Sequence, residues 1–163
     1  EIPEEYISRN NGVMLISSGK IRQSNEGCAC TMNSILKQFI KHLTVGENEV
    51  VLLDMEAGVE HFGRGVDNSV DLILMIVDPS FESLKLTKKI QQLGDSIGKT
   101  VFFVLNKVNE LVLPTMLESI DDQSKVLAVI STDTEIAGRG LVGDELMMEI
   151  PEIHMLARKI LKQ

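Results

Sequence analysis

The chain alternates short apolar runs with longer stretches in which apolar residues recur at helical spacing. The apolar runs predict five strands, over Gly12–Ser17, Val50–Asp54, Asp71–Val77, Thr100–Asn106 and Val126–Ser131. Several of these runs are apolar at nearly every position, which is typical of strands that are buried on both faces of a parallel sheet.

Helical periodicity predicts four helices, over Thr31–Leu43, Ser80–Ile97, Glu110–Ile120 and Pro151–Lys162. Pro79 and Gly98 bracket the second of them, because proline favours a helix start and glycine a helix end. The polar stretches Ile21–Gly27 and Gly58–Asn68 are predicted to be loops. Alternating strands and helices predict a single α/β domain over residues 1–163, with a mostly parallel sheet flanked by helices.

The composition agrees with one globular domain and disfavours nucleic acid and membranes as partners. The chain has 163 residues, 44% of them apolar, and a net charge of −8, which disfavours nucleic acid as a partner. No apolar run is long enough for a membrane-spanning helix, so no membrane contact is expected. The chain begins with Glu1 rather than Met, so we expect that it was trimmed or that it starts inside a longer gene.

Cys28 and Cys30 are candidate metal ligands because they flank a single residue just before the strongest predicted helix. Thiolates are soft ligands that suit zinc, nickel and copper. Two thiolates leave a tetrahedral site incomplete, so a second chain across a two-fold axis would supply the other two. Alternatively, the two cysteines are small buried residues at a helix start, or they form a local redox pair. Two cysteines this close cannot link distant parts of a fold by a disulfide, as secreted proteins require. The reducing cytoplasm is therefore the expected compartment.

Two strand ends carry candidate nucleotide-binding residues. Asp54 ends a predicted strand, where it suits water-mediated Mg²⁺ binding, and the Gly58 amide that follows suits close approach to a phosphate. Asn106 and Lys107 end a later strand, and the Asn106 side chain both donates and accepts, as base recognition requires. An Asp that caps a turn and an Asn that forms one are the simpler interpretations.

These segments together resemble a known family. The quoted runs are Gly27-Cys28-Ala29-Cys30, the stretch from Leu53 to Gly65 with the pattern Asp-x-Glu-Ala-Gly-x-Glu-His-x-Gly-Arg-Gly, and Leu105-Asn106-Lys107. The chain resembles the MinD/ParA-type ATPases. More closely, it resembles the CooC-type nickel-insertion proteins, which are accessory ATPases of carbon monoxide dehydrogenase. The resemblance implies a P-loop NTPase-like fold.

The resemblance also implies roles for individual residues. Cys28 and Cys30 would hold nickel or zinc between the subunits of a homodimer. Asp54 would be the catalytic switch residue near Mg²⁺ and the attacking water, and Gly58 would lie near the terminal phosphate. Asn106 would read the base of ATP, with Lys107 beside it. The implied client is carbon monoxide dehydrogenase or a similar metalloenzyme.

One part of the family pattern is missing. The family opens with a strand and a phosphate loop, yet no Gly-x-x-x-x-Gly-Lys-[Ser/Thr] occurs in this chain. Either the gene encodes a degenerate relative or the N-terminal segment was removed, and the start at Glu1 favours removal. The chain is therefore expected to be the C-terminal two-thirds of such a domain. We expect it to bind ATP and Mg²⁺ poorly unless the missing segment is supplied, so whether it is an enzyme stays open at this point.

Two other functions fit parts of the sequence. A receiver-like signalling domain would use Asp54 as phospho-acceptor and Lys107 as its partner, but Ile16-Ser17-Ser18 lacks the acidic pair that a receiver needs. A nucleotide-free scaffold would dimerise through the Thr31–Leu43 helix. Dimerisation that persists without metal and without nucleotide would distinguish the scaffold from the metal-binding ATPase-family protein.

Overall fold

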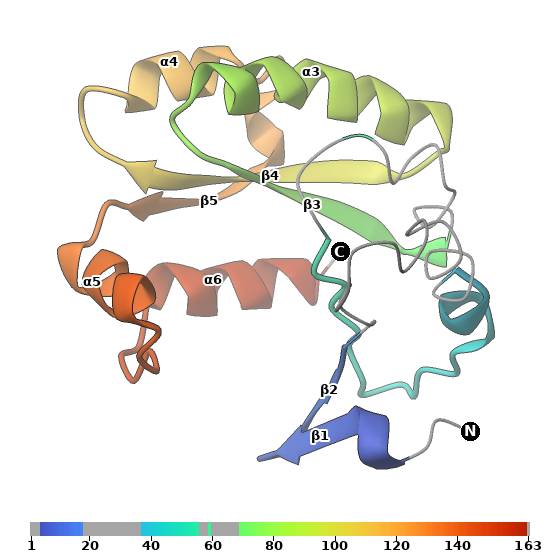
Figure 1. Ribbon diagram of the computed structural model, residues 1–163. Coiled ribbons are helices and arrows are strands. Elements are labelled where there is room, and N and C mark those ends of the chain that lie inside the picture. The colour runs from blue at the N-terminus through green and yellow to red at the C-terminus, as the bar shows by residue number, and fades with distance from the viewer. Residues whose placement is uncertain (1–3, 18–36, 56–58, 60–68, 163) are drawn as a thin grey trace, which may run out of the picture.

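The computed structural model describes residues 4–17, 37–55, 59 and 69–162. Its centre is a parallel three-stranded sheet in the order β3-β4-β5, made of Leu72–Val77, Thr100–Val108 and Val126–Ser131. Helices α3 (Phe81–Ser96) and α4 (Leu113–Glu118) cover one face, and α6 (Pro151–Ile160) covers the other (Figure 1). The predicted α/β class with helices on a parallel sheet is confirmed.

Strand β4 lies at the middle of this sheet and separates two apolar layers. Val101, Phe103 and Leu105 point into the layer beneath α3 and α4 and are almost fully buried. Val104 points to the opposite face, where it packs with Leu127 and with Leu156 of α6. Burial on both faces explains why this run is apolar at nearly every position, as the sequence predicted for a parallel strand.

The predicted strand over Gly12–Ser17 is confirmed as a strand, but it lies outside the parallel sheet. Strand β2 (Val13–Ile16) pairs antiparallel with β1 (Ile7–Asn10), which follows the short 3-10 helix η1 (Glu4–Tyr6). The turn between them places Asn11 at φ 46° and Gly12 at φ 82°. An Asn-Gly pair with both φ values positive is the strongest short hairpin signal. All four residues of β2 are exposed.

The predicted strand over Val50–Asp54 is wrong for this structure. Residues 50–54 form no strand, and the Leu52 side chain is 84% exposed. An apolar run becomes a strand only where a neighbour completes its hydrogen bonds. In the described part of the chain, no strand pairs with residues 50–54.

The helices agree more closely with the sequence. The predicted helix over Ser80–Ile97 is α3. The Ser80 hydroxyl caps its start by accepting from the Ser83 amide, and the helix ends before Gly98 at φ 68°. The predicted Glu110–Ile120 helix is shorter as α4, because proline occupies its first turn. The Pro151–Lys162 helix is α6. Residues 37–42 are helical, and the rest of the Thr31–Leu43 prediction lies mostly outside the described residues.

The sequence analysis missed helix α5 (Thr134–Val142). The Asp133 carboxylate caps its start by accepting from the amides of Glu135 and Ile136, and Gly143 ends it at φ 76°. Two internal glycines, Gly138 and Gly140, lower helix propensity and hide the periodicity. The 3-10 helix η3 (Gln123–Lys125) leads into β5.

The predicted loops over Ile21–Gly27 and Gly58–Asn68 lie outside the described residues, apart from Val59. None of the helices in the described ranges has the length and apolar content that a membrane crossing requires.

Gly94 lies in α3 against Val101 of β4, where there is no room for a side chain. A methyl group at this position would lie 2.3 Å from a Val101 methyl and 3.1 Å from the Lys99 carbonyl oxygen. We expect Gly94→Ala to lower the free energy of unfolding by about 1–3 kcal/mol, because the core must shift to admit the extra atom. Denaturant unfolding followed by circular dichroism measures the change.

Gly138→Ala is the matched control, because an added methyl at Gly138 in α5 meets nothing within 4 Å. This substitution should stabilise the protein by about 0.5–1 kcal/mol through helix propensity alone. If both substitutions change stability equally, the close approach of α3 to β4 is not what requires glycine at position 94.

Candidate functional site

Polar side chains gather at the edge of the sheet where the parallel strands end. Because all three strands run in the same direction, Asp78, which follows β3, lies beside the last residues of β4. In open α/β sheets this carboxyl edge is where ligands bind. The two strands thus join side chains that are 28 positions apart in the sequence.

Asp78 joins the two predicted nucleotide-binding residues of β4. The Asn106 amide nitrogen donates to Asp78 Oδ1 at 2.9 Å, and the Lys107 ammonium group contacts Asp78 Oδ2 at 2.5 Å. Each carboxylate oxygen therefore has one donor. The ion pair is partly exposed, with 63% of the Lys107 side chain and 40% of the Asp78 side chain accessible, so it orients these groups more than it stabilises the fold.

A bulge at the end of β4 places Asn106 and Lys107. The register with β5 shifts between Leu105 and Val108, and Lys107 has φ 55°. A non-glycine residue in this left-handed region costs roughly 1–2 kcal/mol. Bulges and such strained residues concentrate beside functional sites, where they re-aim side chains. Strand β4 continues to Val108, so Asn106 lies inside the bulge rather than at the predicted strand end.

The other predicted site residues are not brought to this cluster. Asp54 is exposed in an irregular segment instead of ending a strand. Cys28, Cys30 and Gly58 lie outside the described residues. Within the described ranges, no three His, Cys, Asp or Glu side chains are grouped so that they could hold a metal ion.

The sequence analysis missed Asp78, although the signal was present. Asp78 follows the apolar run Leu72–Val77, just as Asp54 follows its own run, and Pro79 marks the turn into α3. The same strand-end reasoning that selected Asp54 applies to Asp78. Only the pairing of β3 with β4 shows which of the two carboxylates reaches Asn106.

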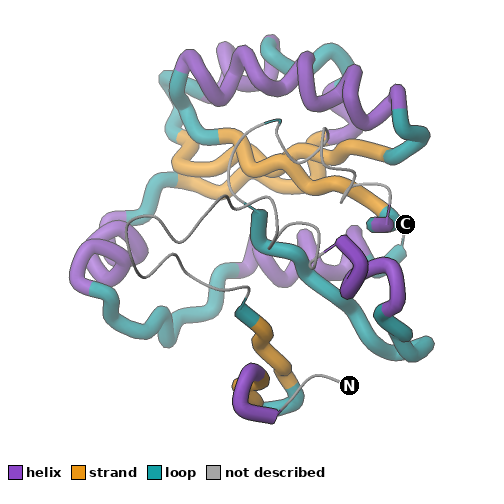
Figure 2. The backbone as a smooth tube through the Cα atoms, turned by 45° about the vertical axis from the view of Figure 1, so that its right-hand side comes forward, coloured by secondary structure: helices purple, strands orange, loops and turns teal. Residues whose placement is uncertain are grey.

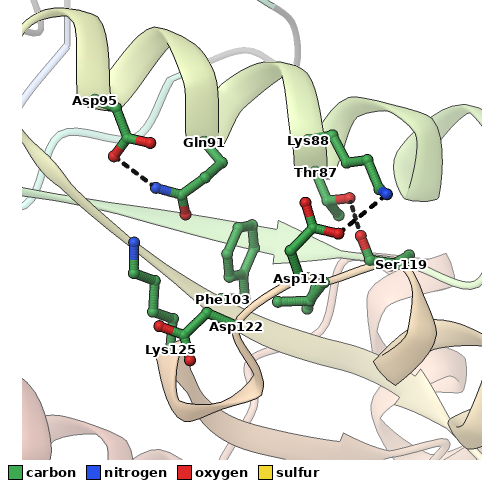
Figure 3. Close-up of a pocket in the computed structure, with 10 residues that line it drawn as sticks. Thr87, Lys88, Gln91, Asp95, Phe103, Ser119, Asp121, Asp122 and Lys125 are labelled. Carbon is green, nitrogen blue, oxygen red and sulfur yellow. Dashed lines mark hydrogen bonds and ion pairs between the residues drawn. The ribbon is translucent and has the colours of Figure 1, made fainter.

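Apart from this cluster, a hollow lies between α3 and the loop that leads into β5 (Figure 3). It has a volume of about 260 Å³ and a floor of buried Phe103, Ile120 and Thr87. The Thr87 hydroxyl is already satisfied, since it contacts the Ser119 carbonyl at 2.8 Å. Figure 3 shows Lys88 directed at Asp121, with which it forms an ion pair at 3.0 Å.

Asp122 lines the same hollow and caps η3. Hydrogen bonds from the Ser124 hydroxyl and from the Ser124 amide hold the pKa of Asp122 below its usual value, and nearby Lys125 acts in the same direction. Because this pKa is lowered on folding, the stabilisation is present above the ordinary Asp range and is lost as the pH falls through the lowered pKa. Asp122 thus orders the turn before β5 at neutral pH.

Comparison with known proteins defines the group to which this chain is related. It is 44% identical over 152 residues to the uncharacterized ATP-binding protein MJ0084 of Methanocaldococcus jannaschii, which covers 93% of this chain and 61% of the relative. It is 31% identical over 144 residues to the carbon monoxide dehydrogenase accessory protein CooC of Rhodospirillum rubrum, covering 88% of this chain and 55% of CooC.

A third relative, the uncharacterized ATP-binding protein MJ0823 of Methanocaldococcus jannaschii, is 31% identical over 140 residues, or 84% of this chain and 54% of the relative. No protein-family model matches the chain. The chain spans a little over half the length of these relatives.

These matches confirm the resemblance that the motifs predicted. The chain is homologous to the CooC-type carbon monoxide dehydrogenase accessory proteins and to ATP-binding proteins of the MJ0084 type. Its parallel sheet flanked by helices is consistent with the P-loop NTPase-like fold that this relationship implies. Figure 2 shows the sheet between its helical layers, with the β1–β2 hairpin apart from the sheet, near the N-terminus.

The exposure of the Asp78–Lys107 pair generates a quantitative prediction. A double-mutant cycle with Asp78→Ala and Lys107→Ala should give a coupling free energy of about 0.2–1 kcal/mol, because solvent screens the pair. Denaturant unfolding of the four proteins measures the coupling, which should shrink when salt is added. A coupling several times larger that does not respond to salt would show that the pair is buried.

Proposed function

We propose that this chain is the larger part of a nucleotide-dependent accessory protein that assists metal insertion into carbon monoxide dehydrogenase or a similar metalloenzyme. The observation that carries the proposal is the position of Asn106 at the carboxyl edge of a parallel sheet, in a chain whose relatives include ATP-binding proteins and CooC. The edge of the sheet is where a nucleotide would bind, and the relatives indicate that this nucleotide is ATP.

The base of the nucleotide is assigned to Asn106, with Lys107 beside it. The Asn106 amide is only partly buried and belongs to a bulge, which turns it away from regular pairing with β5. An amide that both donates and accepts suits the edge of a purine base. By resemblance, Asp54 and Gly58 would serve the Mg²⁺ and phosphate end of the same nucleotide.

The phosphate end needs a strand that is not among those in the described residues. Among the described strands, β3 pairs only with β4, so its other edge has unpaired amide and carbonyl groups. Residues 50–54 pair with none of the described strands either, and Leu52 is exposed. We propose that one strand, followed by a phosphate loop, completes the domain between them. The greater length of the relatives supports this.

The metal is assigned to Cys28 and Cys30, where it would be cargo for the client enzyme. Two thiolates from each of two chains would complete a tetrahedral site for nickel or zinc, which requires a homodimer and a reducing compartment such as the cytoplasm. A nucleotide that favours the dimer would then control when the four thiolates come together.

The receiver-like alternative loses support in this structure. A receiver pairs its phospho-acceptor with a lysine, yet Lys107 contacts Asp78, and Asp54 does not end a strand. The nucleotide-free dimeric scaffold differs from our proposal in one measurable respect. It would dimerise without metal and without nucleotide.

Metal titration tests the cysteine site. The reduced protein should bind one nickel or zinc ion per two chains and become a dimer, because each chain supplies only two thiolates. Native mass spectrometry reports both the metal and the number of chains. The double variant Cys28→Ser/Cys30→Ser should lose the metal and the metal-dependent dimer.

The control variant is His154→Ala, which removes an exposed potential ligand on α6 and should leave metal uptake unchanged. A protein that stays monomeric and takes up neither metal would refute the shared site. A dimer that forms equally well without metal would favour the scaffold.

Strand completion yields a separate prediction. When a strand followed by a loop of the Gly-x-x-x-x-Gly-Lys-[Ser/Thr] type is joined ahead of Glu1, ATP should bind with an affinity that the 163-residue chain lacks, because the phosphate loop supplies amides and a lysine for the phosphates. Hydrogen exchange should slow at residues 50–54 and along β3, since both gain pairing partners. Unchanged exchange at these two segments would contradict the proposed position of the strand.

A further inference from the structure

We propose that Asp78 is a positioning residue that fixes the Asn106 amide in one orientation and so makes the site prefer adenine over guanine. This inference rests on the proposed nucleotide-binding function. The sequence motifs did not select Asp78. The contact between Asp78, which follows β3, and Asn106 of β4 would determine which base binds.

The first step concerns the orientation of the Asn106 amide. An amide can rotate by half a turn and exchange its donor and acceptor ends. A carboxylate has acceptors only, so the Asn106 nitrogen must face Asp78 Oδ1, from which it lies 2.9 Å away. The Lys107 ammonium group donates to the other carboxylate oxygen, Oδ2. Each oxygen of Asp78 therefore accepts from one donor.

The second step concerns how firmly Asp78 is held. Its backbone amide donates to the Ser83 hydroxyl at 3.1 Å, and its carbonyl accepts from the Ser80 amide at 2.7 Å. Ser80 in turn caps α3 through the Ser83 amide at 3.2 Å. Asp78 is therefore tied to the start of a 16-residue helix as well as to the end of β3. A carboxylate on such a backbone can keep a neighbouring amide in one orientation.

The third step concerns what this amide offers to a ligand. Within the described part of the chain, the Asn106 oxygen has no hydrogen-bond partner, and its nitrogen has a second hydrogen to donate. Adenine presents an amino donor beside the N7 acceptor, which matches a carbonyl oxygen and an N–H group together. Guanine presents two acceptors at the same edge, so its O6 would meet the amide oxygen. The fixed orientation therefore favours adenine.

The test compares 5′-adenylate and 5′-guanylate at millimolar concentrations, which probe base recognition without the phosphate loop. Nuclear magnetic resonance of the 163-residue chain follows the Asn106 side-chain amide. We expect this signal to shift with both nucleotides and the affinity for 5′-adenylate to be about tenfold higher, as one bidentate amide–base contact allows.

Two substitutions separate positioning from a merely structural role. Asp78→Ala should reduce the preference towards equal affinity, because the freed amide can rotate. Asp78→Asn keeps the shape but offers one acceptor and one donor, and the Lys107 ammonium group requires the acceptor. The Asn106 amide should then turn its oxygen towards position 78 and its nitrogen towards the ligand, so the preference should move towards 5′-guanylate.

Asp95→Asn is the matched control, because Asp95 accepts from Gln91 on the exposed side of α3 and takes no part in the cluster. It should keep the wild-type preference, and denaturant unfolding of every variant confirms that each is folded. Equal binding of both nucleotides by the wild-type chain, or an unchanged preference in both Asp78 variants, would overturn the role of Asp78 while the nucleotide site stands. No shift of the Asn106 signal with either nucleotide would refute the site itself.

Discussion

The structure depends on strand β4, which is paired on both sides and covered on both faces. Its hydrogen bonds go to β3 and β5, and its side chains alternate between the layer under α3 and the layer over α6. Burial of such a strand is the main favourable contribution that the described domain makes to its own folding. The register between β4 and β5 shifts at Phe103–Val104 and again between Leu105 and Val108, and the second shift contains Asn106 and Lys107.

The polar cluster at this edge follows from that second shift. The parallel direction of β3 and β4 brings Asp78 next to the bulge, and the capped start of α3 holds Asp78 there. Solvent reaches the ion pair, so its contribution to stability is small. The cluster is thus better understood as a means of orienting an amide than as a means of holding the fold together.

The relationship to CooC-type accessory proteins offers an explanation for the segments of the structure that lack a pairing partner. One edge of β3 and the apolar run at residues 50–54 both lack a partner among the described strands. Unpaired strand edges and exposed apolar runs are costly, and relatives of greater length have residues to cover them. An accessory protein that joins a nucleotide edge to a thiolate pair can couple nucleotide binding to metal delivery, which is the proposal we favour.

Local pattern determined much of this protein. Apolar runs predicted β3, β4 and β5, periodicity and capping residues predicted α3 and α6, and the motifs around the cysteines and Asn106 predicted the relationship to CooC. These features depend on neighbours within a few residues, so the sequence by itself specifies them.

The tertiary structure decided what required contacts between distant segments. It decided that Val13–Ile16 pairs in a hairpin, that residues 50–54 form no strand, and that Asp78 rather than Asp54 reaches Asn106. An apolar run has the same pattern whether or not a partner strand lies beside it. Pairing is a property of two segments, and only the folded arrangement shows which two meet.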